Sequence, residues 1–217
     1  MDASRRWCLV LPVKRLDVAK TRLGPPYADH RRSLALAFAL DTTVAALACP
    51  LVATVQVVTD DPEAAAELTA VGATVTGDHP DAGLNPALAH GAALAARMHP
   101  GTAVGTVTAD LPALRPDELA VLLGRAARHE RSFVRDAQGT GTTLLLALDA
   151  DDLRPMFGAG SAERHAHSGA VEIAADRLPS VRRDVDTAAD LDAALTLGVG
   201  SWTSRVLDGL GSRSQAG

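Results

Sequence analysis

The segment from Val104 to Leu114 constrains the fold of this chain more than any other, and its sequence is VGTVTADLPAL. Small and β-branched residues lead to one carboxylate, Asp110, and Pro112 ends the run. A short apolar run bounded by turn signals is typical of a strand buried on both faces of a parallel sheet. Because ligands bind outside the carboxyl ends of such strands, we expect Asp110 to lie at a binding site.

Strand-like and helix-like segments alternate along the chain. Besides the run from Val104, the strand-like segments are residues 8–13, 51–59, 73–76, 132–134, 142–147, 171–174 and 181–185. The helix-like segments are residues 29–47, 62–72, 86–98 and 187–197, and two that begin at Pro116 and Ser161. This alternation predicts an α/β fold, with a mostly parallel sheet and helices on both faces. The irregular second half of the chain predicts a small antiparallel part.

The length of 217 residues predicts one domain over residues 1–217. Because the pattern weakens beyond Gly198, we expect a weakly structured tail over residues 200–217. The apolar helix faces fit either a core or the interface of a homodimer, so the sequence leaves the oligomeric state open.

Composition argues against several classes of partner. The net charge of −5 and the lack of a Lys/Arg block argue against nucleic acid. No apolar run reaches the length of a membrane span, so no membrane partner is expected. Two cysteines, Cys8 and Cys49, are too few for a disulfide framework and suit a reducing compartment. We therefore expect a cytoplasmic protein.

A basic loop, KRLDVAKTRL, follows the first strand over residues 14–23. It holds the cations Lys14, Arg15, Lys20 and Arg22. Taken alone, such a run is more often a solvated surface. Because the chain is acidic overall and the loop follows the carboxyl end of a strand, we interpret it as a site that neutralises a triphosphate and its leaving pyrophosphate.

A second acidic group, RDVDT, occupies residues 183–187. Alternate residues of a strand point to the same side, so Asp184 and Asp186 are expected to project together. With Asp110 they form an oxygen set suited to Mg²⁺, which keeps several waters and uses one or two carboxylates plus substrate phosphates. The alternative is that Asp186 only caps the last helix and Asp184 is solvated.

Two loops are rich in glycine and hydroxyl groups: GTGTT at residues 139–143 and FGAGS at 157–161. Their N–H and O–H groups suit an anion, although an ordinary turn explains each loop alone. Neither matches a P-loop or a dinucleotide fingerprint. His165 and His167 lack cysteines at zinc spacing, and we expect them on a helix surface. The absence of a Gly-x-Ser-x-Gly elbow disfavours hydrolases.

Six segments match a known family in this order: LPVKRLDVAKTRL (11–23), GLNPAL (83–88), TADLPAL (108–114), GTGTTLL (139–145), FGAGSAERH (157–165) and RDVDTAADL (183–191). Together they resemble the guanylyltransferases of coenzyme F-420 biosynthesis, from residue 9 to about residue 200. The resemblance implies a Rossmann-like nucleotidyltransferase fold of the nucleotide-diphospho-sugar transferase type. One branch of the family uses 2-phospho-L-lactate, and the actinobacterial branch uses phosphoenolpyruvate.

The resemblance also implies roles for individual residues. It implies Mg²⁺ ligands at Asp110, Asp184 and Asp186, acceptor contacts at Thr142, Gly158 and Ser161, and nucleotide contacts at Lys14, Lys20, Arg22, Leu84 and Asn85. Most of the wider superfamily has a glycine-rich loop after the first strand, and PVKRLDVA replaces it here. The triphosphate is therefore expected to rely on the loop cations, and the expected catalytic residues are Asp110, Lys14, Lys20 and Arg22.

The implied reaction joins GTP to a phosphorylated three-carbon acid and releases pyrophosphate. An ionised phosphate is already a nucleophile, so the lack of a recognisable base or nucleophile agrees with it. The Ala/Arg/Asp-rich composition is typical of actinobacteria, and for the actinobacterial branch the resemblance implies phosphoenolpyruvate as acceptor and enolpyruvyl-diphospho-guanosine as product. The alternative acceptor is 2-phospho-L-lactate. Two further alternatives are a nucleotidyltransferase for a sugar phosphate or molybdopterin acceptor, and a non-catalytic nucleotide-binding protein.

Overall fold

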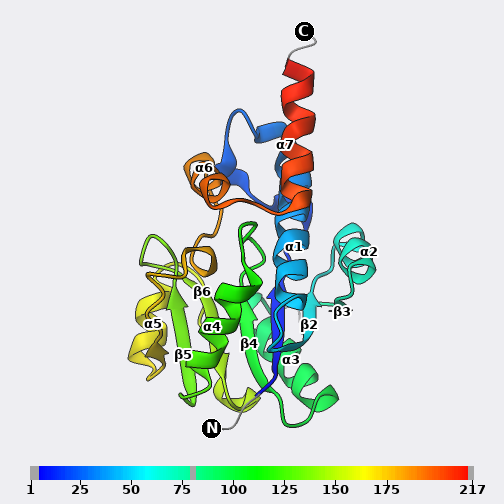
Figure 1. Ribbon diagram of the computed structural model, residues 1–217. Helices are drawn as coiled ribbons and strands as arrows, with labels where there is room; N and C mark the ends of the chain where they lie inside the picture. Colours follow the sequence, from blue (N-terminus) through cyan, green and yellow to red (C-terminus); the bar gives the residue numbers. More distant parts are fainter. Residues whose placement is uncertain (1–4, 79–81, 215–217) are drawn as a thin grey trace.

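The computed structural model describes residues 5–78 and 82–214, and within them seven strands form one sheet (Figure 1). In spatial order the strands are β3 (Thr74–Thr76), β2 (Val52–Val58), β1 (Trp7–Pro12), β4 (Ala103–Val107), β6 (Thr142–Ala147), β5 (Arg131–Arg135) and β7 (Val171–Glu172). The pairs β1–β2, β1–β4, β2–β3 and β5–β7 are parallel, whereas β6 is antiparallel to both β4 and β5. The predicted mostly parallel sheet with a small antiparallel part is confirmed.

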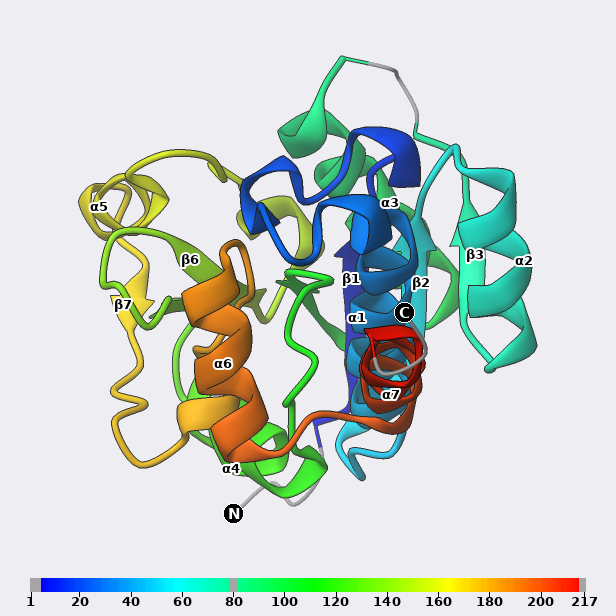
Figure 2. The same ribbon diagram turned by 90° about the horizontal axis from the view of Figure 1, so that it is seen from above.

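Helices cover both faces of the sheet (Figure 2). They are α1 (Arg31–Leu47), α2 (Pro62–Ala70), α3 (Leu84–Met98), α4 (Pro116–Ala126), α5 (Ser161–His167), α6 (Ala188–Leu197) and α7 (Ser201–Ser214). The alternation within β1 shows how the layers pack. Leu9 and Leu11 belong to the core shared with α1, α2 and α4, whereas Cys8 and Val10 belong to the core shared with α3 and α5.

The strand order creates a crevice at one edge of the sheet. From β1 the chain moves outward through β2 to β3, and then crosses back to β4 on the other side of β1. The loops that follow β1 and β4 therefore leave the sheet in different directions, which is where ligands bind in open α/β sheets. The basic loop follows β1 and Asp110 follows β4, so both reach this edge.

The prediction of a strand over residues 181–185 is wrong. A 3-10 turn, Pro179–Val181, is followed by irregular backbone. The segment passes the end of the sheet instead of joining it, and the Val185 N–H donates to the carbonyl of Asp110 at 3.0 Å. The N-cap of α6 is Thr187, which forms a capping box with Asp190. Asp186 is thus not the cap of this helix.

The weakly structured tail expected over residues 200–217 is instead the helix α7 as far as Ser214, and residues 215–217 lie outside the described residues. The buried carboxylate of Asp41 in α1 accepts hydrogen bonds from the N–H groups of Trp202 (3.1 Å) and Thr203 (2.9 Å). These bonds satisfy donors in the first turn of α7, which lies beside α1 in both views (Figures 1 and 2).

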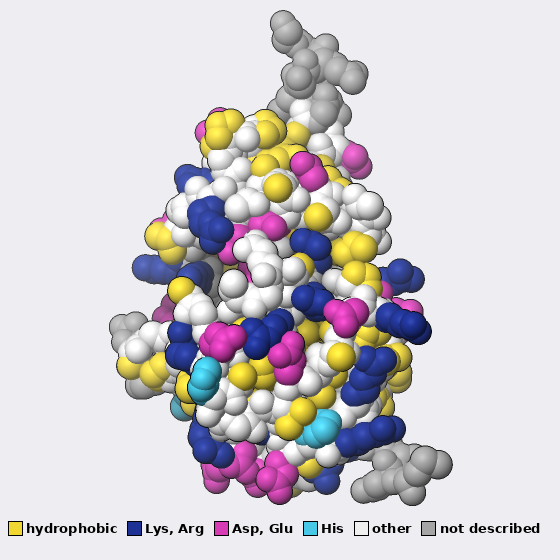
Figure 3. Space-filling model, turned by 90° about the vertical axis from the view of Figure 1, so that its left-hand side faces the viewer, with side chains coloured by type: hydrophobic (Ala, Val, Ile, Leu, Met, Phe, Trp, Pro, Cys, Tyr) yellow, Lys and Arg dark blue, Asp and Glu magenta, His cyan; other side chains and the backbone are white. Residues whose placement is uncertain are grey.

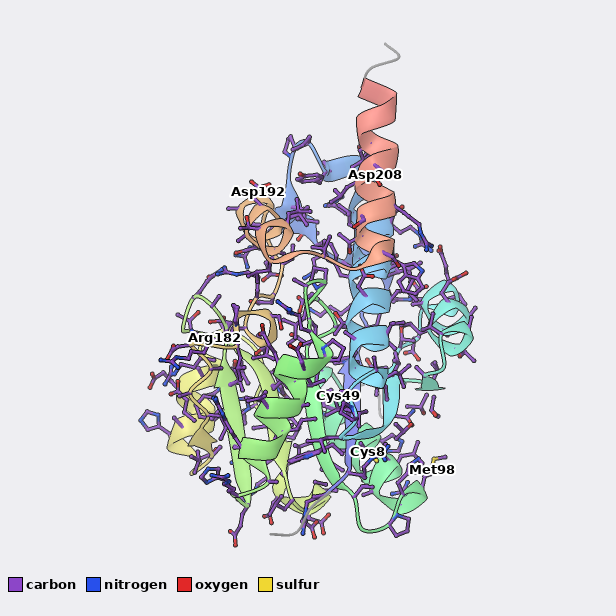
Figure 4. All side chains as sticks on the ribbon, in the orientation of Figure 1. Cys8, Cys49, Met98, Arg182, Asp192 and Asp208 are labelled. Atoms are coloured by element: carbon purple, nitrogen blue, oxygen red, sulfur yellow. The ribbon has the colours of Figure 1, made fainter. Side chains whose placement is uncertain are left out.

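The state of the cysteines and the distribution of surface charge agree with what the composition predicts. Cys8 and Cys49 are buried and free (Figure 4). On the face shown in Figure 3, side chains of both charge signs are interspersed. Among the described residues, no helix has the length and apolar character needed to cross a bilayer.

Candidate active site

A pocket of about 400 Å³ opens between the loops that follow β1 and β4. Part of its wall is apolar and includes Val13, Val18 and Phe157. The structure brings six of the predicted site residues together in this wall: Lys14, Lys20, Arg22, Leu84, Asp110 and Asp186. The pocket thus combines an apolar surface with both cations and carboxylates.

The basic loop is held in place by buried anchors. Its 3-10 turns, Leu16–Val18 and Thr21–Leu23, bury the side chains of Leu16 and Leu23. The Leu16 N–H donates to Asp61 at 2.9 Å, and the same carboxylate caps α2. Lys20 has a left-handed φ of 53°. For a residue other than glycine this conformation costs about 1–3 kcal/mol and persists only where the surroundings fix it.

Two carboxylates fix the Lys20 ammonium. Its Nζ lies 2.5 Å from Asp110 Oδ2 and 3.0 Å from Asp186 Oδ1, and the Lys20 side chain is only 11% exposed. Burial alone would lower the pKa of Lys20, but the charges of Asp110 and Asp186 together outweigh it and raise the pKa. Arg22 adds a more exposed ion pair to Asp186 at 3.3 Å. Lys20 therefore stays charged in the pocket wall.

The cations of the site do not fully neutralise its aspartates. The bond from Val185 to the Asp110 carbonyl sets Asp184 and Asp186 on either side of a buried valine, next to Asp110. Burial and the charges of Asp110, Asp136 and Asp186 raise the pKa of Asp184 to about 7. Asp110 Oδ1 is buried and has no hydrogen-bond partner among the described residues. Excess negative charge and an unpaired oxygen suit a divalent cation.

The three aspartates do not already form a metal cage. In the part of the chain that the structure describes, no three Asp, Glu, His or Cys side chains are placed to hold a metal ion together. The Lys20 ammonium lies between two of the three carboxylates. A cation that binds there has to compete with Lys20, so ligation by all three aspartates stays a prediction.

The three residues predicted to bind the acceptor do not line this pocket, although their neighbour Phe157 does. Thr142 begins β6, Gly158 lies in the preceding loop of α5, and Ser161 is the first residue of α5. The two glycine loops touch, since the Ala162 N–H donates to the Thr140 carbonyl at 3.2 Å. The first loop is tight, because a Cβ on Gly141 would collide with Asp136. The geometry places the three residues in one region and leaves their role a prediction.

Leu84 and Asn85 begin α3 but differ in their contacts. Leu84 lines the pocket. The Asn85 amide instead pairs with the backbone of Phe157, accepting from its N–H at 2.7 Å and donating to its carbonyl at 3.2 Å. Asn85 therefore ties the α5 loop to α3, and a direct nucleotide contact by this side chain stays a prediction.

Sequence reasoning missed the surroundings of the acceptor region. His165 was expected on a helix surface, but it is fully buried, while the side chain of His167 is 82% exposed. The error arises because the partner of His165, Thr142, lies in β6, 23 residues away in the sequence, where the local pattern does not reveal it. The pocket residues that were missed include Phe157 and Thr108, and the buried hydroxyl of Thr108 has no partner among the described residues. Thr108 lies in the matched TADLPAL segment, which was the only signal available for it.

We expect His165 to make the protein acid-sensitive. Burial, with the charges of Arg131 and Arg164, lowers the pKa of His165 from 6.5 to about 4. Between these values the unfolded chain binds a proton that the folded chain does not, so the free energy of unfolding falls as the pH falls. The loss is at most about 3 kcal/mol. The free energy of unfolding is measured with urea above pH 6.5 and again near pH 4. It should fall more between these two conditions for wild type than for His165→Asn. Equal losses would contradict the assignment.

The family assignment of the sequence is confirmed by comparison with known proteins. The family described as guanylyl transferase CofC like matches residues 7–214. A phosphoenolpyruvate guanylyltransferase of Thermomonospora curvata is 57% identical over 203 residues, which cover 94% of this chain and 89% of that protein. One of Streptomyces coelicolor is 54% identical over 202 residues, which cover 93% of this chain and 95% of that protein.

The fold also matches solved structures of nucleotidyltransferase type. A putative nucleotide-diphospho-sugar transferase from Desulfovibrio desulfuricans superimposes with a TM-score of 0.59 at 16% identity, covering 89% of this chain and 96% of that chain. At this identity the match shows the fold alone, and it confirms the predicted α/β fold of nucleotidyltransferase type. With the family match over nearly the whole length, the chain belongs to the CofC-like guanylyltransferase family.

Proposed function

We propose that this enzyme transfers the guanylyl group of GTP to phosphoenolpyruvate, giving enolpyruvyl-diphospho-guanosine and pyrophosphate, in coenzyme F-420 biosynthesis. The observation that carries the proposal is the Lys20 ammonium held between Asp110 and Asp186 in the wall of a pocket that the cations Lys14 and Arg22 also line. This arrangement suits a triphosphate, and an ionised acceptor phosphate needs no base to attack GTP. The relatives named for phosphoenolpyruvate support the choice of acceptor.

The chemistry requires two anions to meet. An oxygen of the acceptor phosphate attacks the α-phosphorus of GTP, and the bond from that phosphorus to the bridging oxygen of the β-phosphate breaks. The pyrophosphate leaves with the bonding electron pair. Lys14, Lys20 and Arg22 neutralise the triphosphate and the leaving group. Thr142, Ser161 and the Gly158 N–H hold the acid so that its phosphate faces GTP.

We propose that Asp110, Asp184 and Asp186 hold Mg²⁺, with Lys20 moving off the carboxylates toward the phosphates. The unpaired oxygen of Asp110 and the raised pKa of Asp184 support this donor set. When bound there, Mg²⁺ supplies positive charge that polarises the α-phosphate and aligns the phosphates. We further propose that the reaction takes place in the cytoplasm, and the two free cysteines support a reducing compartment.

The test is a product assay with defined acceptors. Purified protein, GTP and Mg²⁺ are mixed with phosphoenolpyruvate, 2-phospho-L-lactate or 3-phosphoglycerate, and pyrophosphate release and product mass are recorded. We expect the enolpyruvyl product to form fastest. These acids differ by small groups, and contacts at that level are worth about 1–3 kcal/mol. A higher kcat/KM with another acid, or none with any of them, would overturn the proposed acceptor.

A further inference from the structure

His165 is a buried side chain that makes a hydrogen bond with each of its ring nitrogens. Its Nδ1 lies 2.9 Å from the Thr142 hydroxyl, and the Met156 N–H donates to its Nε2 at 3.1 Å. The rings of Phe133 and Phe157 pack against it, with centroids 5.9 Å and 5.3 Å away. The imidazole thus joins β6 to the loop that leads into α5.

These contacts fix the tautomer of the ring. A backbone N–H can only donate, so Nε2 must be the unprotonated nitrogen. Nδ1 therefore carries the proton and donates it to the Thr142 oxygen. The neutral form is also the stable one, because burial and the facing charges of Arg131 and Arg164 lower the pKa of His165.

The Thr142 hydroxyl is oriented as a consequence. Its oxygen accepts from His165, so its own proton has to point elsewhere, and a hydroxyl proton is what an anionic ligand needs. The same ring also fixes the loop from Met156 to Ser161. Asn85 holds Phe157 on one side of the loop, and Arg164 donates to the Met156 carbonyl at 3.0 Å on the other.

We propose that His165 is a positioning residue for the acceptor acid. Its Nδ1–H turns the Thr142 hydroxyl proton toward the acid, and its Nε2 holds the loop carrying Gly158 and Ser161 against the Thr140–Thr142 turn. This inference rests on the proposed function, in which Thr142, Gly158 and Ser161 bind the acid. In this role His165 makes no contact with GTP. Substitutions of His165 should therefore change the KM for phosphoenolpyruvate and leave the KM for GTP unchanged.

Three substitutions of His165 distinguish the contributions of its two hydrogen bonds. His165→Asn places an amide N–H near the position of Nδ1 and keeps the bond to Thr142. His165→Gln places a carbonyl near the position of Nε2 and keeps the bond from Met156. His165→Phe keeps a ring and loses both bonds. His167→Asn is the matched control, because the same helix exposes that side chain.

We expect His165→Phe to raise KM for phosphoenolpyruvate about tenfold or more, with KM for GTP unchanged. His165→Asn should recover most of this loss and His165→Gln little of it, while His167→Asn behaves as wild type. A parallel rise of KM for both substrates, or recovery by glutamine as complete as by asparagine, would overturn the positioning role.

The tautomer of His165 can be tested without measuring enzyme activity. In ¹⁵N spectra of the ligand-free protein, we expect the His165 ring to be protonated at Nδ1 alone, and a ring protonated at Nε2 would refute the inference. If wild type forms no product with any acid, the proposed function fails. Calorimetric titration of phosphoenolpyruvate into wild type and His165→Phe then still tests the positioning role, since equal affinities would exclude it.

Discussion

Asp110→Asn should lower guanylyl transfer by about 10²- to 10³-fold, with the fold retained. The amide keeps the shape of the side chain but removes the charge that pairs with Lys20 and the unpaired oxygen offered to a cation. The measurement is kcat/KM from pyrophosphate release, with circular dichroism to check the fold.

The control for this prediction is Asp192→Asn, which changes an exposed aspartate on α6, the helix that follows Asp186 (Figure 4). It should retain the activity of wild type, because it makes the same chemical change outside the pocket. Activity of Asp110→Asn within a few-fold of wild type would exclude Asp110 from the reaction.

Lys20→Met should destabilise the protein and also make it more responsive to Mg²⁺. Breaking a buried ion pair costs on the order of 3–5 kcal/mol, and the partial exposure of Asp186 reduces this to about 2 kcal/mol. For a chain of this size that corresponds to a fall in Tm of roughly 4–8 °C. Because methionine no longer competes for Asp110 and Asp186, added Mg²⁺ should raise the Tm of the variant more than that of wild type.

Lys14→Met is the matched control for stability, since Lys14 lies in the same loop and pocket but is exposed. Its Tm and its response to Mg²⁺ should match those of wild type. If Mg²⁺ raises the Tm of Lys20→Met and wild type by the same amount, the ammonium and the metal do not share a position.

The sheet could be predicted because its strands carry their own signals. β6 was predicted with its observed limits, Thr142 and Ala147, since an apolar run lies between Gly141 and an aspartate cluster. The segment over residues 181–185, VRRDV, is predicted as a strand on much weaker grounds, and in the described structure it joins no strand of the sheet and bonds to the Asp110 carbonyl. Periodicity describes which residues are buried, and it does not say which backbone groups they pair with.

The C-terminal helix shows a second limit of local patterns. Nothing near residue 200 predicts the start of α7, because the carboxylate that binds its first turn is Asp41, in α1. The buried state of His165 has the same cause, since Thr142, the partner of its Nδ1, lies in β6, 23 residues earlier in the chain. In both cases the stabilising group is distant in sequence.

The pocket itself was predicted better than its details. Lys20, Arg22 and Asp110 are predicted from their positions after strand-like runs, and the switch in strand order at β1 brings them together. Asp186 is predicted from a strand that does not form, and it reaches the pocket from irregular backbone that is bonded to the Asp110 carbonyl through Val185. The ion pairs of Lys20 with Asp110 and Asp186 are not predicted by the sequence. The pattern assigns Lys20 to the triphosphate and the two aspartates to the metal, so it gives no reason to pair them with each other.

A crystal structure with Mn²⁺ and a non-hydrolysable GTP analogue tests the central claim most directly. Anomalous scattering should reveal a metal peak bonded to Asp110, Asp184 and Asp186, with the Lys20 ammonium displaced from Asp110 toward the phosphates. A peak at other residues, or a triphosphate bound in the pocket while Lys20 remains between Asp110 and Asp186, would contradict the account.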